Sequence, residues 1–408
     1  MSDFDIVIVG GGMVGSALAC ALGNSSLQVA LLEGARPERI HTYDDIDLRV
    51  SAISHASQRI FAALDVWDAI SAVRVSPFRD MRVWDASGTG KIHFDSSTIG
   101  QSTLGWIIEN RVIQHALLAQ TQTFDNIALF CPAALYQATL AKDAVNLQLE
   151  DGRKLRTRLL IGADGADSKV RRLSGIASGG WNYAQKGVVS TVATEYHHEE
   201  TAWQRFLPTG PLAFLPLHDG RCSIVWSTTP DQADHLLNQG ATAFAHSLAE
   251  AFAWRLGAIT RVGPRGAFPL HTQFAQNYVK PRIALIGDAA HVVHPLAGQG
   301  VNLGLLDAAS LAEVLLAGAT AGFDPGSYKV LRRYERWRKG ENILMLGVLD
   351  GLKRLFGNSL PPVRLLRNAG LNLTDRATPL KQLLARRAMG LDGDLPQLAR
   401  NPHSAPLP

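Results

Sequence analysis

The chain has few cysteines for its length. Cys20, Cys131 and Cys222 are the three among 408 residues, and they lie far apart. None of them forms a CxxC or a Cys/His ligand pattern, so the sequence predicts neither a disulfide framework nor a zinc site. Small apolar thiols of this kind suit buried positions.

Long apolar runs and a basic leader are also missing. No run reaches the roughly 18 apolar residues that span a bilayer, and the first five residues are acidic rather than basic. A secretory signal begins with a positive segment. We therefore expect an intracellular protein that begins near Met1 and is either cytoplasmic or peripheral on the inner face of the membrane.

Acidic residues are scarce in one late region. The whole chain carries a net charge of +4, but basic side chains far outnumber acidic ones over residues 329–387. Such asymmetry indicates an acidic partner or a membrane surface, and a solvated helical face is the alternative. With 46% hydrophobic and 19% charged residues, the composition otherwise predicts a globular protein of two associated domains.

A dinucleotide-binding pattern opens the chain. The β-branched run at residues 5–9 precedes a glycine turn with G-x-G-x-x-G spacing, an alanine-rich stretch and a second strand at residues 28–33. Such glycines let the backbone approach a pyrophosphate at a helix N-terminus, and an acidic residue ending the second strand accepts hydrogen bonds from the ribose. This motif does not separate FAD from NAD. Its expected binding residues are Gly10, Gly12, Gly15 and Glu33.

A late signature distinguishes the two cofactors. A short strand runs into a Gly-Asp pair, and a second glycine turn follows a few residues later. An aspartate there can bind the ribityl chain of FAD, and the exposed amides can lie against the electron-rich edge of the isoalloxazine. A capped helix beside a plain loop is disfavoured because the pattern accompanies the N-terminal motif. The expected residues are Gly287, Asp288, Gly298, Gly300, Val301 and Asn302.

A third signature, at residues 162–171, again follows an apolar strand. Asp164 is expected to orient the loop near the pyrophosphate. Arg171 either meets a phosphate or nicotinamide donor or belongs to a solvated basic helix after a tight turn. His291 and His294 look catalytic, yet a packed or hydrogen-bonded histidine is the commoner role, so no catalytic residue is assigned.

The rest of the chain suggests an insertion and a helical end. Residues 181–268 alternate apolar and polar side chains, as half-buried antiparallel strands do, and leucines at spacings of three and four predict helices from Ser310 onward. The expected division is an FAD-binding domain (residues 1–75, 100–180 and 275–330), a substrate-binding domain (76–99 and 181–274), a helical region (331–391) and a flexible tail (392–408).

At these signatures the sequence resembles the group A flavoprotein hydroxylases over nearly its whole length. The resemblance implies the para-hydroxybenzoate hydroxylase-like α/β fold, in which a Rossmann-type FAD-binding domain carries an inserted antiparallel-sheet substrate domain and a helical C-terminal region. Within the group it is similar to the ubiquinone-biosynthesis hydroxylases. By that similarity Arg49 lies beside the flavin, the alternative being an ordinary helix-start arginine. The matching segments are residues 48–54, 109–110, 214–217, 294–304 and 387–391.

The resemblance also implies a reaction. NAD(P)H or another electron donor reduces the flavin, dioxygen adds at its C4a carbon, and the C4a-hydroperoxyflavin hydroxylates an electron-rich ring. The protein positions the ring and excludes water, so that the oxygen is not lost as hydrogen peroxide. No second G-x-G-x-x-G is present, which fits transient docking of the nicotinamide donor.

Other functions share parts of this pattern. An NAD-dependent dehydrogenase would not need the late Gly-Asp signature, and a halogenase of similar fold is expected to carry a Trp-x-Trp motif, which the chain lacks. A prenyl-chain reductase shares the flavin fold. A non-catalytic FAD-binding scaffold of a biosynthetic complex would share every cofactor motif.

The segments around the motifs are most similar to the branch that hydroxylates C5 of 2-polyprenylphenol. They are residues 83–85, 222–227, 332–336, 388–391 and 395–396. No physical reason connects them with a ring position, so the C6 and C1 hydroxylations of the pathway remain alternatives. The implied partners are a prenylated phenol substrate, a membrane surface and a ubiquinone-biosynthesis protein complex; no nucleic acid is expected.

Overall fold

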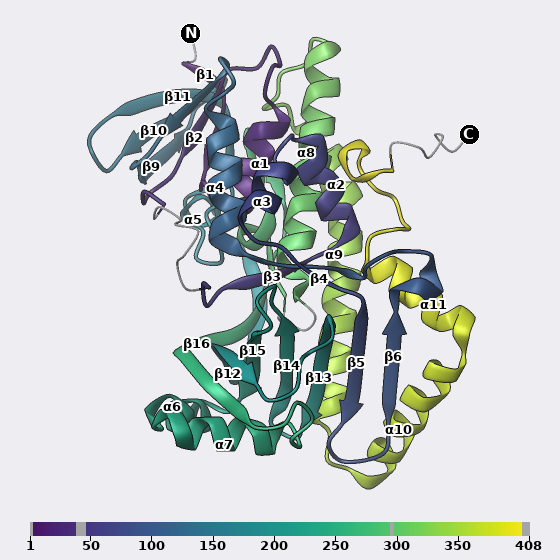
Figure 1. Ribbon diagram of the computed structural model, residues 1–408. Helices are drawn as coiled ribbons and strands as arrows, with labels where there is room; N and C mark the ends of the chain where they lie inside the picture. The colour runs from purple at the N-terminus through teal and green to yellow at the C-terminus, as the bar shows by residue number, and fades with distance from the viewer. Residues whose placement is uncertain (1–2, 38–45, 294–297, 402–408) are drawn as a thin grey trace.

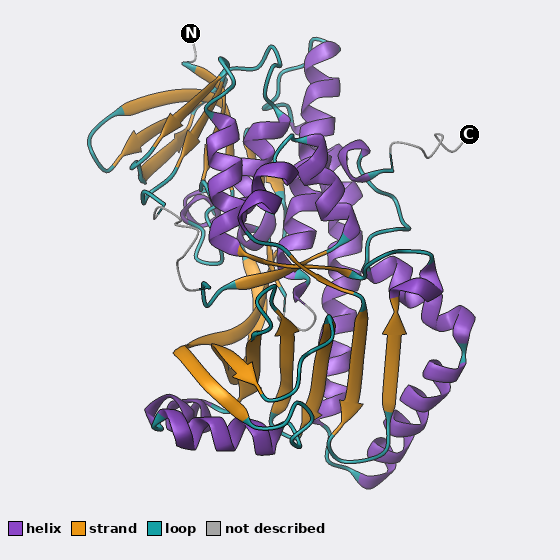
Figure 2. Ribbon diagram, in the orientation of Figure 1, coloured by secondary structure: helices purple, strands orange, loops and turns teal. Residues whose placement is uncertain are grey.

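The computed structural model describes residues 3–37, 46–293 and 298–401. Figure 1 shows two lobes, of which the first, drawn at the top, holds the N-terminal strands. Figure 2 shows that helices crowd around this lobe, whereas the second is dominated by one broad sheet. His294, Pro295 and the two residues after them, which contribute to the late signature, lie outside the described residues.

A largely parallel sheet forms the centre of the first lobe. Its middle strand, β1 (Phe4–Val9), is an apolar run in which Ile6 and Val7 are fully buried, as suits a strand covered on both faces. The strand order is β17-β18-β11-β1-β2-β8. Parallel to β1 run β2 (Val29–Leu32), β8 (Ile127–Phe130), β11 (Lys154–Gly162) and β18 (Ile283–Leu285); β17 (Val279–Lys280) and the hairpin of β9 (Leu135–Leu140) and β10 (Val145–Leu149) are antiparallel.

The chain winds to opposite sides of β1, because β2 and β8 lie on one side and β11 and β18 on the other. Sheets of this kind bind their ligands outside the carboxyl ends of the strands, at the point where the winding reverses. The strands β1, β11 and β18 each end at the start of a glycine signature. The topology therefore brings the three signatures to one edge, and the expected Rossmann-type organisation is confirmed.

The second sheet has the order β19-β16-β12-β15-β14-β13-β5-β6. Its longest strands, β12 (Ser178–Thr194) and β16 (Ile259–Ala275), have 17 residues each and pair along their length. We expected antiparallel pairing, and this holds except between β5 and β13, which are parallel. These two come from separate insertions, so no hairpin sets their relative direction. The other strands are β5 (Asp80–Asp85), β6 (Lys91–Asp95), β13 (Thr201–Leu207), β14 (Gly210–Pro216), β15 (Cys222–Thr228) and β19 (His291–Val292).

Smaller elements complete the two lobes. A three-stranded sheet, in the order β3-β7-β4, lies between them. Its strands are β3 (Val50–Ile53), β4 (Ser76–Phe78) and β7 (Gly105–Glu109). The shorter helices are α1 (Met13–Ala21), α2 (His55–Ala63), α3 (Trp67–Val73), α4 (Asn110–Thr121), α5 (Lys169–Leu173), α6 (Pro230–Asn238) and α7 (Ala241–Ala251), with 3-10 turns η1 (Ser96–Ile99) and η2 (Gly287–Ala289).

The last long helices begin at α8 (Gly300–Thr320), earlier than the leucine spacing predicted. Within the described residues α8 is the one helix long and apolar enough to cross a membrane. It is 67% buried and packs against α1, α2 and α9 (Tyr328–Gly357), as a core helix does. Figure 1 shows α10 (Pro361–Arg376) and α11 (Thr378–Ala388) along the outer edge, where α10 contacts β6.

The start of the expected flexible tail differs from our expectation. The 3-10 turn η4 (Gln397–Ala399) packs against α2 and α8, and Ala399 is fully buried. The backbone N–H of Gln397 donates to Glu313 at 2.8 Å, and Trp337 Nε1 donates to the carbonyl oxygen of Asp394 at 3.2 Å. The proline-rich composition suggested fraying, but apolar side chains at Leu395 and Ala399 anchor residues 392–400 to the core.

Candidate functional site

A cavity of about 470 Å³ lies between the two lobes, at the carboxyl edge of the parallel sheet. This size suits a small-molecule or cofactor site. Its walls come from the turn after β1, from the segment leading into β3, from η2 and the start of α8, and from the inner face of the second sheet. The cavity thus connects the three glycine signatures with the inserted sheet.

The glycine turn after β1 is built for close backbone contact. Gly10 has a φ of +107°, and a Cβ there would lie 2.3 Å from the carbonyl oxygen of Ala163. A Cβ on Gly12, by contrast, would meet nothing within 4 Å. Gly12 borders the cavity and precedes α1, whose first turn has no side-chain cap. The turn therefore leaves an open cradle beside uncapped helix amides, as a pyrophosphate requires.

Glu33 follows β2 at the same edge. Its Oε2 accepts a hydrogen bond from the backbone N–H of Gly11 at 2.7 Å, and its Oε1 accepts one from Ala35 at 3.0 Å. The carboxylate is half-buried. It therefore holds the glycine turn in place, and a carboxylate has further lone pairs for ribose hydroxyls.

Asp288 projects from η2 into the cavity. Its carboxylate has no hydrogen-bond or ion-pair partner within the described part of the chain, and enclosure by the cavity walls raises its pKa above the ordinary value. Electrostatic interactions with His291, Arg49 and His271 oppose that rise. The side chain is exposed to the cavity, and an acceptor that lacks a protein partner there is suited to a ligand hydroxyl.

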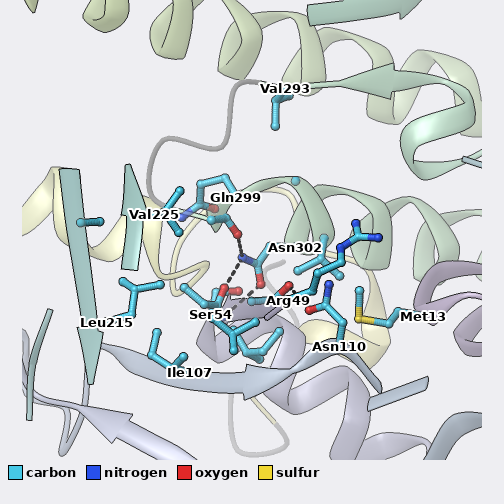
Figure 3. A pocket seen from close by; sticks show the side chains of 18 of the residues that line it. Met13, Arg49, Ser54, Ile107, Asn110, Leu215, Val225, Val293, Gln299 and Asn302 are labelled. Atoms are coloured by element: carbon cyan, nitrogen blue, oxygen red, sulfur yellow. Dashed lines mark hydrogen bonds between the residues drawn. The ribbon is translucent and has the colours of Figure 1, made fainter. Parts of the chain in front are cut away.

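Arg49 lies across the cavity, just before β3. Figure 3 shows Arg49 beside Asn110 and Met13 at one end of the pocket. The buried carboxylate of Glu109 anchors this segment, because it accepts the N–H of Asp47 at 2.7 Å and pairs with Arg74 at 2.8 Å. Residues 109–110 are one of the matching segments of the sequence, but the sequence alone did not predict that Glu109 anchors the segment before β3.

Asn302 joins the segments that border the cavity. Its Oδ1 accepts from the N–H of Ser54 at 3.0 Å and from the hydroxyl of Ser57 at 2.7 Å. Its Nδ2 donates to the carbonyl oxygens of Ala52 at 2.8 Å and Gly298 at 3.2 Å. The protein thus satisfies the whole amide, so the side chain positions the loop and β3 (Figure 3). Of the neighbouring expected residues, Gly298, Gly300 and Val301 border the cavity.

The third signature fixes loops next to the cavity through hydrogen bonds. Asp164 accepts hydrogen bonds from the N–H groups of Lys169 and Val170 at 2.7 and 3.0 Å, so it fixes the loop to the start of α5. Arg171 is buried and donates to the carbonyl oxygens of Ala289 at 2.9 Å and Ala166 at 2.6 Å. Its guanidinium therefore links two loops, which is neither of the two roles that we expected.

The wall formed by the second sheet is largely apolar. Leu215 and Val225 line it, Ile107 of β7 continues the apolar lining, and Figure 3 shows all three at the opposite end from Arg49. Trp203 and Trp226 both belong to the buried core of this sheet, and Trp203 also borders the cavity, which the sequence did not reveal. Polar lining residues that the sequence did not indicate are Gln204, Ser227 and Gln299.

These features fit FAD. The open cradle at Gly12 and the uncapped start of α1 suit the pyrophosphate, and Glu33 stands where the ribose of the nucleotide is bound in such folds. The unpartnered carboxylate of Asp288 lies further along the same cavity. Among the described residues, no group of His, Cys, Asp and Glu could hold a metal ion.

The sequence matches one protein-family model, described as an FAD binding domain, over residues 3–340. It is 40% identical to the 3-demethoxyubiquinol 3-hydroxylase of Escherichia coli (strain K12), over 95% of this chain and 98% of that protein. It is 40% identical to the ubiquinone hydroxylase UbiL of Rhodospirillum rubrum, over 97% and 92%. The human ubiquinone biosynthesis monooxygenase COQ6 is 38% identical, over 93% and 91%.

Solved structures share the fold. The p-nitrophenol 4-monooxygenase PnpA from Pseudomonas putida superposes with a TM-score of 0.77 over 95% of this chain and 98% of that one, at 21% identity. PqsL of P. aeruginosa, in complex with 2-aminobenzoylacetate, gives a TM-score of 0.74 over 90% and 99%, at 23% identity. Both support the para-hydroxybenzoate hydroxylase-like architecture expected from the sequence.

Proposed function

The chain belongs to the FAD-binding-domain family and is an FAD-dependent aromatic-ring monooxygenase, and we propose that its substrate is a polyprenylated phenol of ubiquinone biosynthesis. One observation carries the proposal. A single cavity joins the nucleotide edge of the parallel sheet to an apolar wall of the second sheet. A flavin held at the first end would face an aromatic ring held at the second.

The residues of the first end have separate tasks in this proposal. The turn at Gly12 and the amides of α1 hold the pyrophosphate, and Glu33 binds the ribose. Asp288 binds the ribityl chain, while the backbone at Gly300 and Val301 lies against the ring edge. When bound, FAD reduced by NAD(P)H or another donor supplies the oxygen-transfer chemistry with dioxygen.

The residues of the second end hold the substrate. Leu215, Val225 and Ile107 form an apolar surface for a ring, and the few polar groups, such as Gln204, are suited to orient a phenolic hydroxyl. Apolar walls also exclude water, which would otherwise divert the activated oxygen. The chain matches relatives named for ubiquinone hydroxylation over nearly their full length, and this similarity supports a prenylated phenol as the substrate.

For the ring position we propose C5, on the resemblance of the segments that flank the motifs. One observation favours a second candidate, the C6 step: the Escherichia coli relative at 40% identity is named for hydroxylating a demethoxyubiquinol. Hydroxylation at either C5 or C6 is compatible with a phenolic ring that is activated by its own oxygen.

Turnover of a phenol by the FAD-loaded protein tests the proposal. The purified enzyme, a reductant and a phenol with a short prenyl chain are expected to give a product that has gained one oxygen atom from labelled dioxygen. Asp288→Ala is expected to weaken FAD binding by about 1 to 3 kcal/mol, or roughly 5- to 150-fold. Asp234→Ala is the matched control, since this carboxylate pairs with Lys186 at the surface.

Two outcomes would contradict the proposal. An FAD-loaded protein that consumes reductant at the same rate with and without the phenol, and forms no hydroxylated product, is an FAD-binding scaffold. Wild-type FAD affinity in Asp288→Ala would remove Asp288 from the site.

A further inference from the structure

More than half of the large hydrophobic side chains that are exposed in the described chain gather on its last three helices. They lie within residues 343–384, although the molecule has an ample core elsewhere. Large exposed apolar patches mark protein–protein or membrane contacts, and the concentration of these side chains on three consecutive helices indicates such a contact. We call this set the leucine face: Ile343, Leu344, Val348, Leu352, Leu355, Leu360, Leu365, Leu366, Leu373, Leu380, Leu383 and Leu384.

The helix α10 shows how the face is held outward. Leu365, Leu366 and Leu373 are 74%, 72% and 69% exposed. The opposite side of the helix is fixed to the second sheet, because Arg367 Nε donates to the carboxylate of Asp85 at 2.6 Å in a buried pair. That ion pair fixes the orientation of α10 about its axis, so the leucines on the opposite side of the helix face outward.

The helix α11 connects the same face with the cavity. Its outer side carries Leu383 and Leu384, which are 58% and 47% exposed. Its inner side carries Ala385, which is buried, and Ala388, which borders the cavity together with Met389. One helix therefore separates the cavity from whatever covers the leucine face.

The charge around the face favours an anionic surface. Residues 341–391 hold eight Lys or Arg and three Asp or Glu, a net charge of +5, whereas the whole chain carries +4. The net positive charge of the protein is thus confined to these helices. Part of it is paired, since Arg367 is buried against Asp85 and Arg386 pairs with Asp392 just beyond this range, but Arg376 is exposed.

The side-chain types favour a bilayer over a protein partner. Every residue of the leucine face is aliphatic, whereas protein interfaces concentrate their binding energy in Trp, Tyr and Arg, with Leu and Val under-represented. Leucine-rich helix faces with flanking Lys and Arg bind in the headgroup region of membranes.

We propose that the leucine face docks on an anionic lipid bilayer, with α11 as the wall between the bilayer and the cavity. The docking itself stands on the exposed leucines and the charge. Only its purpose, delivery of a prenylated ring from the membrane to the cavity, rests on the proposed function.

Flotation with vesicles tests the docking without any turnover. The FAD-loaded full-length protein is mixed with vesicles of phosphatidylcholine, with and without phosphatidylglycerol. Binding to the anionic vesicles is expected, and added salt should weaken it. The triple variant Leu365→Gln, Leu366→Gln and Leu373→Gln is expected to lose binding roughly tenfold or more, because apolar burial contributes to such adsorption.

The matched control changes three exposed hydrophobic residues elsewhere. Leu140→Gln, Tyr196→Gln and Trp254→Gln alter side chains that are 57%, 58% and 47% exposed, and this variant should bind vesicles like the wild type. Retained flavin absorbance in both variants shows that they are folded. Equal vesicle binding by wild type and leucine variant, no binding by either, or a wild-type dimer that the leucine variant abolishes would each overturn the proposal.

Failure of the docking and failure of the proposed function are distinguishable. Turnover of a water-soluble short-chain phenol should be the same in the wild type and the leucine variant, since none of the three altered residues lines the cavity. Vesicle binding without phenol hydroxylation would preserve the docking and refute the substrate.

Discussion

His291 of β19 and Asp307 of α8 form a buried hydrogen bond of 2.5 Å between imidazole Nε2 and carboxylate Oδ2. Neither side chain is more than 1% exposed. The same carboxylate accepts Arg338 Nε and Asn342 Nδ2, each at 3.0 Å, and the N–H of Gly287 at 3.2 Å. Asp307 therefore ties α8 and α9 to the turn that carries Asp288, and His291 is a packed, hydrogen-bonded histidine.

Asp307→Asn is expected to destabilise the protein by about 3 to 5 kcal/mol, because it leaves the buried Arg338 without its counter-charge. Chemical denaturation measures this loss. Asp234→Asn, at an exposed pair with Lys186, should cost about 1 kcal/mol or less. If Asp307→Asn lowered the free energy of unfolding by only about 1 kcal/mol, the buried charge of Asp307 would not be needed to stabilise the fold.

Stability should depend on pH through the same residue. Burial alone would raise the pKa of Asp307, but His291, Arg338 and Asn342 hold it below the ordinary value of 3.8. Its contribution is therefore complete above about pH 4 and is lost as the pH falls through the lower pKa of the folded state. The stability difference between wild type and Asp307→Asn should shrink as the pH is lowered below 3.8. A stability difference that does not change with pH would contradict a stabilising role for the ionised carboxylate of Asp307.

The glycine turn allows a sharper test of the cofactor site. Gly12→Ala should fold with nearly unchanged stability, because its Cβ meets no protein atom within 4 Å, yet it should lose FAD, because that Cβ enters the cradle. Gly10→Ala should lose stability, since its φ of +107° and the carbonyl oxygen of Ala163 oppose a side chain. Thermal unfolding of the apoproteins and FAD titration separate the two effects. Normal FAD affinity in Gly12→Ala would show that the pyrophosphate lies elsewhere.

Local patterns predicted the parts of this site that depend on backbone. The glycine spacing, the strand before it and the acidic residue after β2 are short-range features, so the Rossmann-type edge could be predicted from the sequence alone. Contacts between distant segments could not be predicted in this way. The sequence left Arg171 either as a ligand for a phosphate or nicotinamide donor or as part of a solvated basic helix. Only the fold shows that its guanidinium donates to the carbonyl oxygens of Ala166 and Ala289.

The basic region shows the same limit. Counting charges over residues 329–387 did not reveal that Arg338 and Arg367 are buried against Asp307 and Asp85. Leucine spacing predicted helices. It could not show which leucines pack against the protein and which are exposed, because that depends on how each helix is packed in the fold.

The buried pair of Arg367 and Asp85 should hold α10 in place. Although burial alone would raise it, the pKa of Asp85 is lowered by hydrogen bonds from Arg367 and Ser87. Asp85→Asn is expected to increase hydrogen exchange throughout α10, since Arg367 loses its counter-charge. Asp234→Asn, which removes an exposed pair with Lys186 outside α10, is the control. Unchanged exchange in α10 would mean that packing alone holds the helix.

The position of hydroxylation is the finest part of the proposed function, and the cofactor residues cannot decide it. In the proposed site Glu33, Asp288 and the glycine turns hold the flavin, so enzymes that oxidise different ring carbons can share them. Oxygen transfer favours a carbon ortho or para to the phenolic oxygen, and C5 meets that condition. Cells that lack this protein are therefore expected to accumulate the unhydroxylated polyprenylphenol, or its C4-hydroxylated derivative where another hydroxylase acts first.

Mass spectrometry of the lipid extract, before and after complementation, measures this outcome. Complementation with Asp288→Ala, expressed at the same level, is the control, because it should leave the intermediate in place if accumulation reflects lost catalysis. A methoxylated late intermediate that lacks only its C6 hydroxyl would instead assign the C6 step, in line with the demethoxyubiquinol named for the Escherichia coli relative. Since the two intermediates differ by whole functional groups, their masses distinguish the two ring positions.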